Sequence, residues 1–269
     1  FVKVCLQGTG GDELFGGYPW RYYKVFDSIS QKDFFNQYYD FWQRLVPDDK
    51  KEELFTEQVL KKIDIKAPRT VFERVFTFND NLKYDKPQEH IINSMYFEIK
   101  TFLSSLFIVG DKLSMANGLE ERFPFMDNDL VNFAMECPVH LKLGEFSSFK
   151  TKLDQSISQV DQVSAEHTDG KMILRKMLAE YVPREIQNAR KQGFSSPDAT
   201  WFRDQSSDFV LNHIHDNKKL FHSIMDTGMI DEIIADHMSG KNNSRLLIWS
   251  FLYMGEFLKQ FSPSEYSGS

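Results

Sequence analysis

Glycine and acidic residues cluster near the start of the chain in a pattern typical of nucleotide sites. Residues 6–18 read LQGTGGDELFGGY and follow a short β-branched stretch. Glycine lets the backbone approach a phosphate and adopt a positive φ, and an acid just beyond, here Asp12, can hold the magnesium that accompanies phosphates. A tight turn in which Asp12 caps the next helix accounts for the same residues. The loop by itself leaves both interpretations open.

A second group of charges lies among apolar residues between Asp111 and Asp127. Glu120, Arg122 and Asp127 belong to this stretch. Buried charges need partners. The stretch therefore predicts either an internal ion-pair network that joins two helices or a set of substrate contacts, and the residues alone do not choose between them.

A third group is basic and contains Lys171 and Lys191, the second of which precedes Gly193 and Phe194. A basic segment that ends in Gly-Phe is typical of a loop that delivers a cation, and a lysine point charge suits phosphate or pyrophosphate. A solvated surface lysine is the alternative for Lys191. The histidines lack zinc-ligand spacing, and the chain has no serine nucleophile elbow.

The elements that must position these groups are almost all helical. Residues 1–6 form the one stretch that reads as a strand, and an isolated strand cannot form a sheet. We therefore expect the rest of the sheet to lie outside the 269 residues of this sequence. The spacing of apolar residues predicts helices over residues 33–46, 49–63, 70–78, 88–109, 111–117, 127–136, 171–181, 198–204, 207–216, 229–238 and 243–261.

Glycine, proline and capping residues set several of these helix ends. Gly110 is expected to end the helix over residues 88–109, and Gly118 the next one. Asp127 is suited to cap the helix that it begins. The polar stretch 144–170 lacks clear periodicity and is predicted to be a mobile loop, with a frayed tail over residues 263–269.

Composition excludes several classes of protein. The chain has 269 residues, of which 41% are hydrophobic and 26% charged, as expected of a globular protein. The 25 phenylalanines predict an aromatic-rich helical core. A net charge of −7 argues against a nucleic-acid partner, and no apolar run approaches the ~20 residues that span a membrane. Two cysteines without a framework are expected to be reduced thiols in a soluble, cytoplasmic protein.

Taken together and in this order, the three groups resemble the synthetase domain of glutamine-hydrolysing asparagine synthetases. Residues 1–262 are similar to the C-terminal part of that domain. The residues that match the family's motifs are Gly8, Gly10, Gly11, Asp12, Glu13, Gly16, Gly17, Tyr18, Asp111, Ser114, Met115, Gly118, Leu119, Glu120, Arg122, Pro124, Phe125, Asp127, Gly170, Lys171, Leu174, Arg175, Lys191, Gly193, Phe194, Pro197, Trp201, Phe202 and Arg203.

The resemblance implies an α/β parent fold, the adenine nucleotide alpha-hydrolase-like fold of ATP pyrophosphatases. Its parallel sheet carries helices on both faces, and these 269 residues would supply a predominantly α-helical portion with few strands. The resemblance also implies a reaction. The side-chain carboxylate of aspartate attacks the α-phosphorus of ATP to give β-aspartyl-AMP and pyrophosphate, and ammonia from glutamine then displaces AMP.

Carried over to this chain, the resemblance assigns a role to each matching residue. Asp12 would be a ligand of Mg²⁺, and Gly8, Gly10 and Gly11 would line the ATP pocket. Lys191 would be catalytic together with Asp12, because it would neutralise charge on the departing pyrophosphate.

Glu120 and Arg122 would shape the side of the pocket that binds aspartate or a related carboxylate. Three residues depart from the family pattern. Gln7 stands at a usual serine, and Ala189 at a common arginine. Thr9 stands where the family often has Asp or Glu, a carboxylate proposed in some members to act in the ammonia step, and threonine is no general base at neutral pH. These departures bear on substrate identity.

Two family features do not occur in the 269 residues: the pyrophosphate loop SGG-x-DS and the glutaminase domain that would supply ammonia. We therefore expect the chain to be part of a longer protein, and to neither bind ATP tightly nor form product alone. A relative that adenylates another carboxylate and a non-catalytic helical scaffold are the alternatives. The sequence is compatible with a monomer and with a homo-oligomer.

Overall fold

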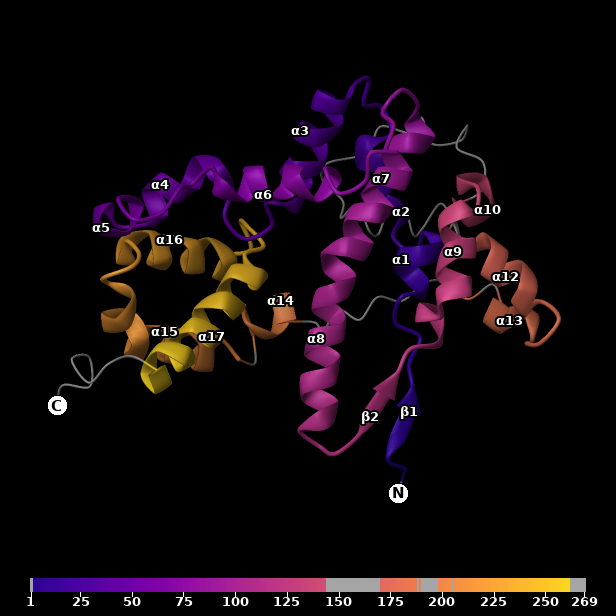
Figure 1. The fold of residues 1–269 in the computed structure, drawn as a ribbon. Helices are drawn as coiled ribbons and strands as arrows, with labels where there is room; N and C mark the ends of the chain where they lie inside the picture. Colours follow the sequence, from indigo (N-terminus) through magenta and orange to yellow (C-terminus); the bar gives the residue numbers. More distant parts are fainter. Residues whose placement is uncertain (1, 144–169, 188, 190–197, 205, 262–269) are drawn as a thin grey trace. The chain divides into compact units, whose positions relative to one another are not determined.

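The computed structural model of the chain describes residues 2–143, 170–187, 189, 198–204 and 206–261 (Figure 1). These residues divide into two compact units. Unit 1 comprises residues 1–41 and 72–192, and unit 2 comprises residues 42–71 and 193–269. The predicted loop over residues 144–170, apart from Gly170, and the predicted tail over residues 263–269 lie outside the described residues.

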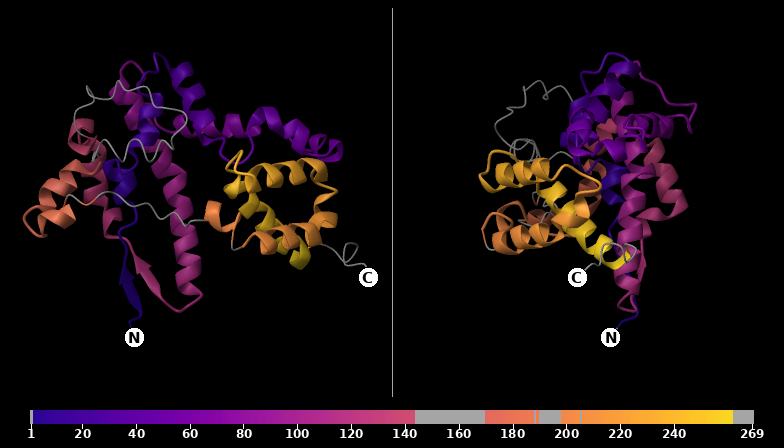
Figure 2. Two further views of the ribbon diagram at one scale, coloured as in Figure 1. Left: turned by 180° about the vertical axis from the view of Figure 1, so that it is seen from behind. Right: turned by 90° about the vertical axis from the view of Figure 1, so that its left-hand side faces the viewer.

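Unit 1 contains a small parallel sheet of two strands. Strand β1 (Val4–Leu6) pairs with β2 (Glu120–Arg122), and the register places Cys5 opposite Glu121. The two strands lie side by side in Figures 1 and 2, and α8 runs alongside β2. The sequence predicted β1 but missed β2, because its residues Glu-Glu-Arg carry no alternation of apolar and polar side chains. The parent fold's larger sheet stays a prediction.

Helices make up most of the rest of unit 1, as the sequence predicted. Two of them, α3 and α6, continue past the unit's boundaries along the chain. The bounds are α1 (Gly11–Phe15), α2 (Pro19–Tyr22), η1 (Tyr23–Val25), α3 (Gln31–Trp42), α6 (Ala67–Phe76), α7 (Pro87–Lys100), α8 (Phe102–Met115), η3 (Pro124–Met126), α9 (Asn128–Glu136), α10 (Val139–Leu143), α12 (Met172–Leu178) and α13 (Arg184–Gln187).

The single long helix predicted over residues 88–109 is wrong, since α7 and α8 are separate helices. The break lies at Thr101, whose φ of −121° and ψ of −68° are not helical. Its hydroxyl donates a hydrogen bond to the carbonyl oxygen of Phe97 at 2.7 Å. A β-branched side chain that hydrogen-bonds back to the preceding turn bends helices.

The prediction that Gly110 ends a helix is also wrong, because Gly110 lies inside α8. A β-carbon at this position would lie 2.7 Å from Oε2 of Glu121, so the glycine allows α8 to approach β2 closely. Gly118 adopts a φ of +66° just after α8 ends, as expected of a helix-terminating glycine.

An aromatic cluster joins three helices of unit 1. Phe34 of α3, Phe72 and Phe76 of α6, and Phe97 of α7 have ring centroids 5.0 to 5.6 Å apart in the contacting pairs. All four side chains are buried. The phenylalanine-rich helical core predicted from composition is therefore confirmed.

Unit 2 is helical in all its described elements, and the core of this unit is apolar. The bounds are η2 (Asp48–Lys50), α4 (Lys51–Leu54), α5 (Glu57–Leu60), α14 (Asp198–Trp201), α15 (Ser207–Phe221), α16 (Thr227–Met238) and α17 (Arg245–Phe261). Its fully buried side chains include Val210, Phe221, Ile230, Ile248 and Phe251.

The predicted helix over residues 49–63 is wrong, because this stretch forms η2, α4 and α5. The chain is extended at Phe55 and Thr56, and Phe55 forms an antiparallel bridge with Met225. The amide of Thr56 donates to the carbonyl oxygen of Ile224 at 3.1 Å. Pairing with a segment distant in the sequence thus interrupts a stretch whose local spacing favours a helix.

Two general expectations can be compared with the structure. Among the described residues, no helix combines the length and apolar character needed to cross a membrane. Cys5 and Cys137 are both free thiols, as expected, and Cys137 is buried.

Candidate functional site

The glycine loop follows β1, and its second and third glycines pack closely against the second motif. Gly10 has a φ of +98°, and a β-carbon there would lie 2.4 Å from Cε of Met126. At Gly11 a β-carbon would lie 3.1 Å from the ring of Phe125. Gly8 differs, because it is exposed and a β-carbon there would meet no atom within 4 Å. Of these three loop glycines, Gly8 is therefore the one with open space beside its backbone.

Asp12 lies in the first turn of α1 and is positioned by Gly17. A β-carbon at Gly17 would lie 1.7 Å from Oδ1 of Asp12, so the carboxylate rests against bare backbone. The N-cap of α1 is Gly10, and no side chain caps α1 or α2. The alternative interpretation of Asp12 as a helix cap is wrong.

Lys171 of the third motif forms an ion pair with Asp12. Its Nζ lies 2.8 Å from Oδ1, and the Asp12 side chain is 25% exposed. The backbone amide of Lys171 donates to the carbonyl oxygen of Phe15 at 2.9 Å, which fixes Lys171 at the end of α1. Lys171 adopts a φ of 56°, uncommon for a residue with a side chain. The sequence analysis identified the basic motif but not this pair.

Arg175 ties the chain that leads to Lys191 onto α12. Its guanidinium donates to the carbonyl oxygens of Gly170 at 3.2 Å, Gln187 at 2.7 Å and Ala189 at 3.2 Å. Lys191 itself lies outside the described residues, so its predicted role is carried by the sequence alone.

Glu120 and Arg122 pair with each other on one face of β2. The Nη2 atom of Arg122 lies 2.9 Å from Oε1 of Glu120, and their side chains are 63% and 54% exposed. The predicted internal network joining two helices is therefore wrong for these two residues. Asp127 caps α9 as predicted, because its Oδ1 accepts from the amides of Asp129 and Leu130.

A buried polar network begins at Glu13, the residue after Asp12, and no sequence pattern predicted it. The hydroxyl of Tyr18 donates to Glu13 at 2.9 Å, and the guanidinium of Arg21 lies 3.9 Å from the centre of the Tyr18 ring. Arg21 also pairs with Glu98 at 3.2 Å, and Tyr38 donates to Glu98 at 3.0 Å. These residues come from α1, α2, α3 and α7 and the turn before α2, so no local pattern could reveal them.

Burial dominates the electrostatics of this network. Desolvation raises the pKa of Glu98 from 4.5 to about 7, although the charge of Arg21 and the hydrogen bond from Tyr38 oppose the rise. Desolvation and then the charge of Glu13 raise the pKa of Tyr18 well above its usual value. Tyr18 therefore remains a hydrogen-bond donor at neutral pH.

The described residues offer a magnesium ion isolated carboxylates rather than a cluster of ligands. In the ranges that the structure describes, no group of three or more His, Cys, Asp or Glu side chains could hold a metal ion. Mg²⁺ is commonly bound by one or two carboxylates together with substrate phosphates. Asp12, partly exposed and already paired with a cation, fits a ligand of such a shared site.

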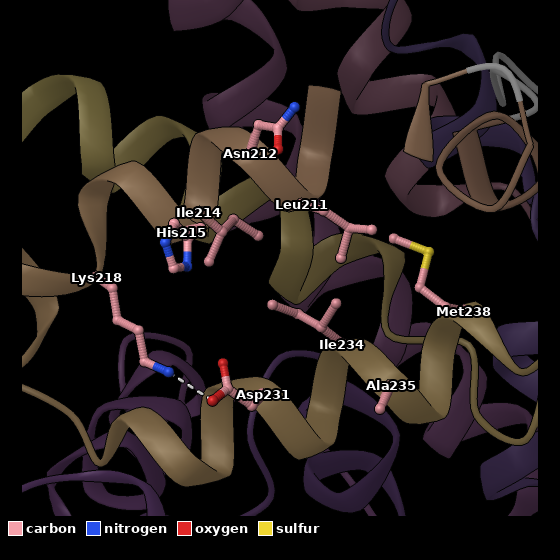
Figure 3. A pocket seen from close by; sticks show the side chains of 9 residues that line it. All are labelled: Leu211, Asn212, Ile214, His215, Lys218, Asp231, Ile234, Ala235 and Met238. Atoms are coloured by element: carbon pink, nitrogen blue, oxygen red, sulfur yellow. Dashed lines mark hydrogen bonds and ion pairs between the residues drawn. The ribbon is translucent and has the colours of Figure 1, made fainter. Parts of the chain in front are cut away.

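A separate cavity of about 490 Å³ lies between α15 and α16 of unit 2 (Figure 3). Its walls are mainly aliphatic, and Lys218 pairs with Asp231 at one side of it at 2.5 Å. None of the residues that line it belongs to the three motifs. Cavity volume therefore does not identify the site that the motifs predict.

The chain belongs to the asparagine synthase family, whose model matches residues 1–259. It is 23% identical to asparagine synthetase [glutamine-hydrolyzing] 1 of Bacillus subtilis, over 99% of this chain and 42% of that protein. It is 22% identical to asparagine synthetase [glutamine-hydrolyzing] 3 of the same organism, over 86% and 32%. The amidase chyE of Penicillium rubens is 28% identical over 40% and 14%. The chain thus spans less than half the length of these relatives.

Proposed function

We propose that this chain provides part of the active site of an ATP-dependent amide-forming enzyme of the asparagine synthetase type. In this reaction the side-chain carboxylate of aspartate attacks the α-phosphorus of ATP, forming β-aspartyl-AMP and releasing pyrophosphate. Ammonia derived from glutamine then attacks the acyl carbon and displaces AMP. The proposal is supported by family membership and by the meeting of the motifs at the glycine loop. Phe125 and Met126 of the second motif lie against this loop, and Lys171 of the third motif pairs with Asp12.

In the proposed site, Asp12 holds Mg²⁺ jointly with the phosphates of ATP. The ion, when bound, neutralises charge on the phosphates. Gly8, Gly10 and Gly11 line the nucleotide pocket, and Gly8 supplies the open backbone that a phosphate or ribose can approach. Lys191 neutralises the charge that develops on the departing pyrophosphate.

Glu120 and Arg122 are proposed to shape the carboxylate-binding side of the pocket. Their exposure leaves the guanidinium accessible, and arginine binds carboxylates through paired hydrogen bonds. A nucleotide substrate and two free cysteines favour a cytoplasmic enzyme.

The decisive experiment replaces Asp12 by asparagine in the full-length protein that contains this chain. Aspartate-dependent exchange between ATP and pyrophosphate should fall by at least about 100-fold, the order expected when a group that stabilises transition-state charge is lost. Asp231→Asn is a matched control, since Asp231 also pairs with a lysine but lies in unit 2. Normal exchange in Asp12→Asn would contradict the proposal.

A related adenylating amidotransferase that acts on another carboxylate is the second candidate. The residues Gln7, Thr9 and Ala189 favour it, because each departs from the pattern that the asparagine synthetases share. Measuring the same exchange with a panel of carboxylic acids distinguishes the two: the acid with the highest kcat/KM identifies the acceptor. A wild-type protein inactive with every acid would indicate a scaffold.

A further inference from the structure

A chain of hydrogen bonds links the glycine loop to β2 through side chains that do not match the family's motif residues. The hydroxyl of Thr9 donates to Oε1 of Gln7 at 3.1 Å. The amide nitrogen of Gln7 in turn donates to Oε1 of Glu121. All three side chains are partly buried.

Glu121 is held firmly at the far end of this chain. Its backbone pairs with Cys5 in the sheet register, and its Oε2 approaches the backbone of Gly110 in α8. Oε2 is buried and accepts no hydrogen bond from any residue that the structure describes. The carboxylate therefore has Gln7 as its hydrogen-bond donor.

The chemistry of the three groups gives the chain one direction. In the two hydrogen bonds Gln7 turns its NH₂ group, which only donates, toward Glu121 and its carbonyl oxygen, which only accepts, toward Thr9. Thr9 must then donate its single hydroxyl proton to that oxygen. The Thr9 oxygen can then only accept a hydrogen bond from any other partner.

Thr9 lies between Gly8, which has open space beside it, and Gly10, in the same loop as Asp12. We propose that Glu121 and Gln7 are positioning residues that make the Thr9 hydroxyl an obligate hydrogen-bond acceptor for a donor group of a substrate. This inference rests on the proposed function, which supplies two such donors: an N–H of the attacking ammonia and a ribose hydroxyl of ATP.

The kinetic test uses Thr9→Val, Thr9→Ser and Glu121→Gln in the full-length protein. Thr9→Val removes one neutral hydrogen bond, so it should lower kcat/KM for the substrate that donates this bond by about 3- to 10-fold. Thr9→Ser should keep the wild-type value. Glu121→Gln should lower kcat/KM by a similar factor. The new amide can both donate and accept a hydrogen bond, so it no longer fixes the orientation of the Gln7 amide. The double variant Thr9→Val with Glu121→Gln should lose no more than Thr9→Val alone.

Two substrates identify the donor. A loss confined to kcat/KM for ammonia, with ATP–pyrophosphate exchange unchanged, assigns it to the amine. A loss in exchange that disappears with 2′- or 3′-deoxy-ATP assigns it to the ribose. Glu136→Gln, an exposed acid on α9, is the control for the charge change. Additive losses, no loss, or failure of Thr9→Ser to retain activity would overturn the inference.

A neutron structure tests the direction of the chain without any activity. A deuteron on the Thr9 oxygen that points to Gln7, and an ND₂ group of Gln7 that points to Glu121, support it. The opposite orientation overturns it even in an active enzyme. If the wild-type protein catalyses no exchange with any carboxylate, the proposed function fails. The neutron structure still shows whether the chain of hydrogen bonds has the proposed direction.

Discussion

The two units bury different kinds of side chain. In unit 1 the buried polar or charged residues that the structure describes are Glu13, Arg21, Ser28, His90, Asn93, Ser94, Glu98, Ser114 and Lys142. In unit 2 the corresponding residues are Asn217 and His237, packed with aliphatic and aromatic side chains. The ion pairs of unit 2, such as Lys218 with Asp231, have exposed members instead.

This difference separates unit 1, which carries the glycine loop, Asp12 and Lys171, from unit 2, which is held together mainly by apolar packing. Burying a charge is unfavourable unless it is paired, so charges in a core that apolar side chains could fill suggest a use beyond stability. In unit 1 one of these charges, Glu13, follows Asp12 directly on α1 and accepts a hydrogen bond from Tyr18. The buried network thus supports the same loop on which the motifs converge.

The largest effect is expected in the core of unit 2. Replacing Phe251, which is fully buried, by alanine should lower the free energy of unfolding by about 3–5 kcal/mol, equally at all pH values, because it leaves a cavity in an apolar core. Hydrogen exchange with mass spectrometry reports the two units separately. Tyr253→Ala, at an exposed position of the same helix, should change the free energy of unfolding by under about 0.5 kcal/mol. A strong pH dependence of the Phe251→Ala effect would contradict the proposed difference between the two units.

A somewhat smaller, pH-dependent effect is expected for Arg21→Met in unit 1. At about pH 8 Glu98 is ionised and would lose its cation, so we expect a loss of about 3 kcal/mol in the free energy of unfolding. At about pH 5 Glu98 is already neutral, because its pKa is raised to about 7, and the loss should be smaller. Equal losses at both pH values would show that Arg21 acts through packing alone.

The exposed pair of unit 2 provides the counterpart to this experiment. Lys218→Met removes the cation from Asp231, whose side chain is 60% exposed. Solvent screens such pairs, so the change should stay under about 1 kcal/mol at either pH. A loss as large as that of Arg21→Met would remove the proposed distinction between the units.

A gain of stability is expected from Lys142→Met in unit 1. Burial lowers the pKa of Lys142 from 10.5 to about 8, so between these values the folded protein binds fewer protons than the unfolded chain and stability rises with pH. Removing the buried amine should raise the free energy of unfolding by up to roughly 3 kcal/mol at neutral pH and abolish that rise. Thermal unfolding at about pH 7 and about pH 10 measures both. An unchanged pH dependence would show that Lys142 is not its source.

Local patterns predicted the elements well where neighbours in sequence decide the structure. The helices over residues 207–216, 229–238 and 243–261 were predicted in place, although α15 extends further, to Phe221. Predictions failed where a distant partner intervenes, as at Thr56, which pairs with Ile224, and at Gly110, which allows α8 to approach β2. Strand β2 was missed for the same reason, since only its pairing with β1 makes it a strand.

The sequence by itself determined the family and predicted which residues carry the chemistry, because the glycine loop, Asp12 and Lys191 lie in short motifs whose order and spacing are specific. Only the tertiary structure decided how those motifs meet: Lys171 on Asp12, and Gln7 between Thr9 and Glu121. Hydrogen bonds and ion pairs act over a few ångströms, whereas Lys171 and Asp12, and likewise Gln7 and Glu121, are separated by more than a hundred residues along the chain. Folding alone brings such groups within reach.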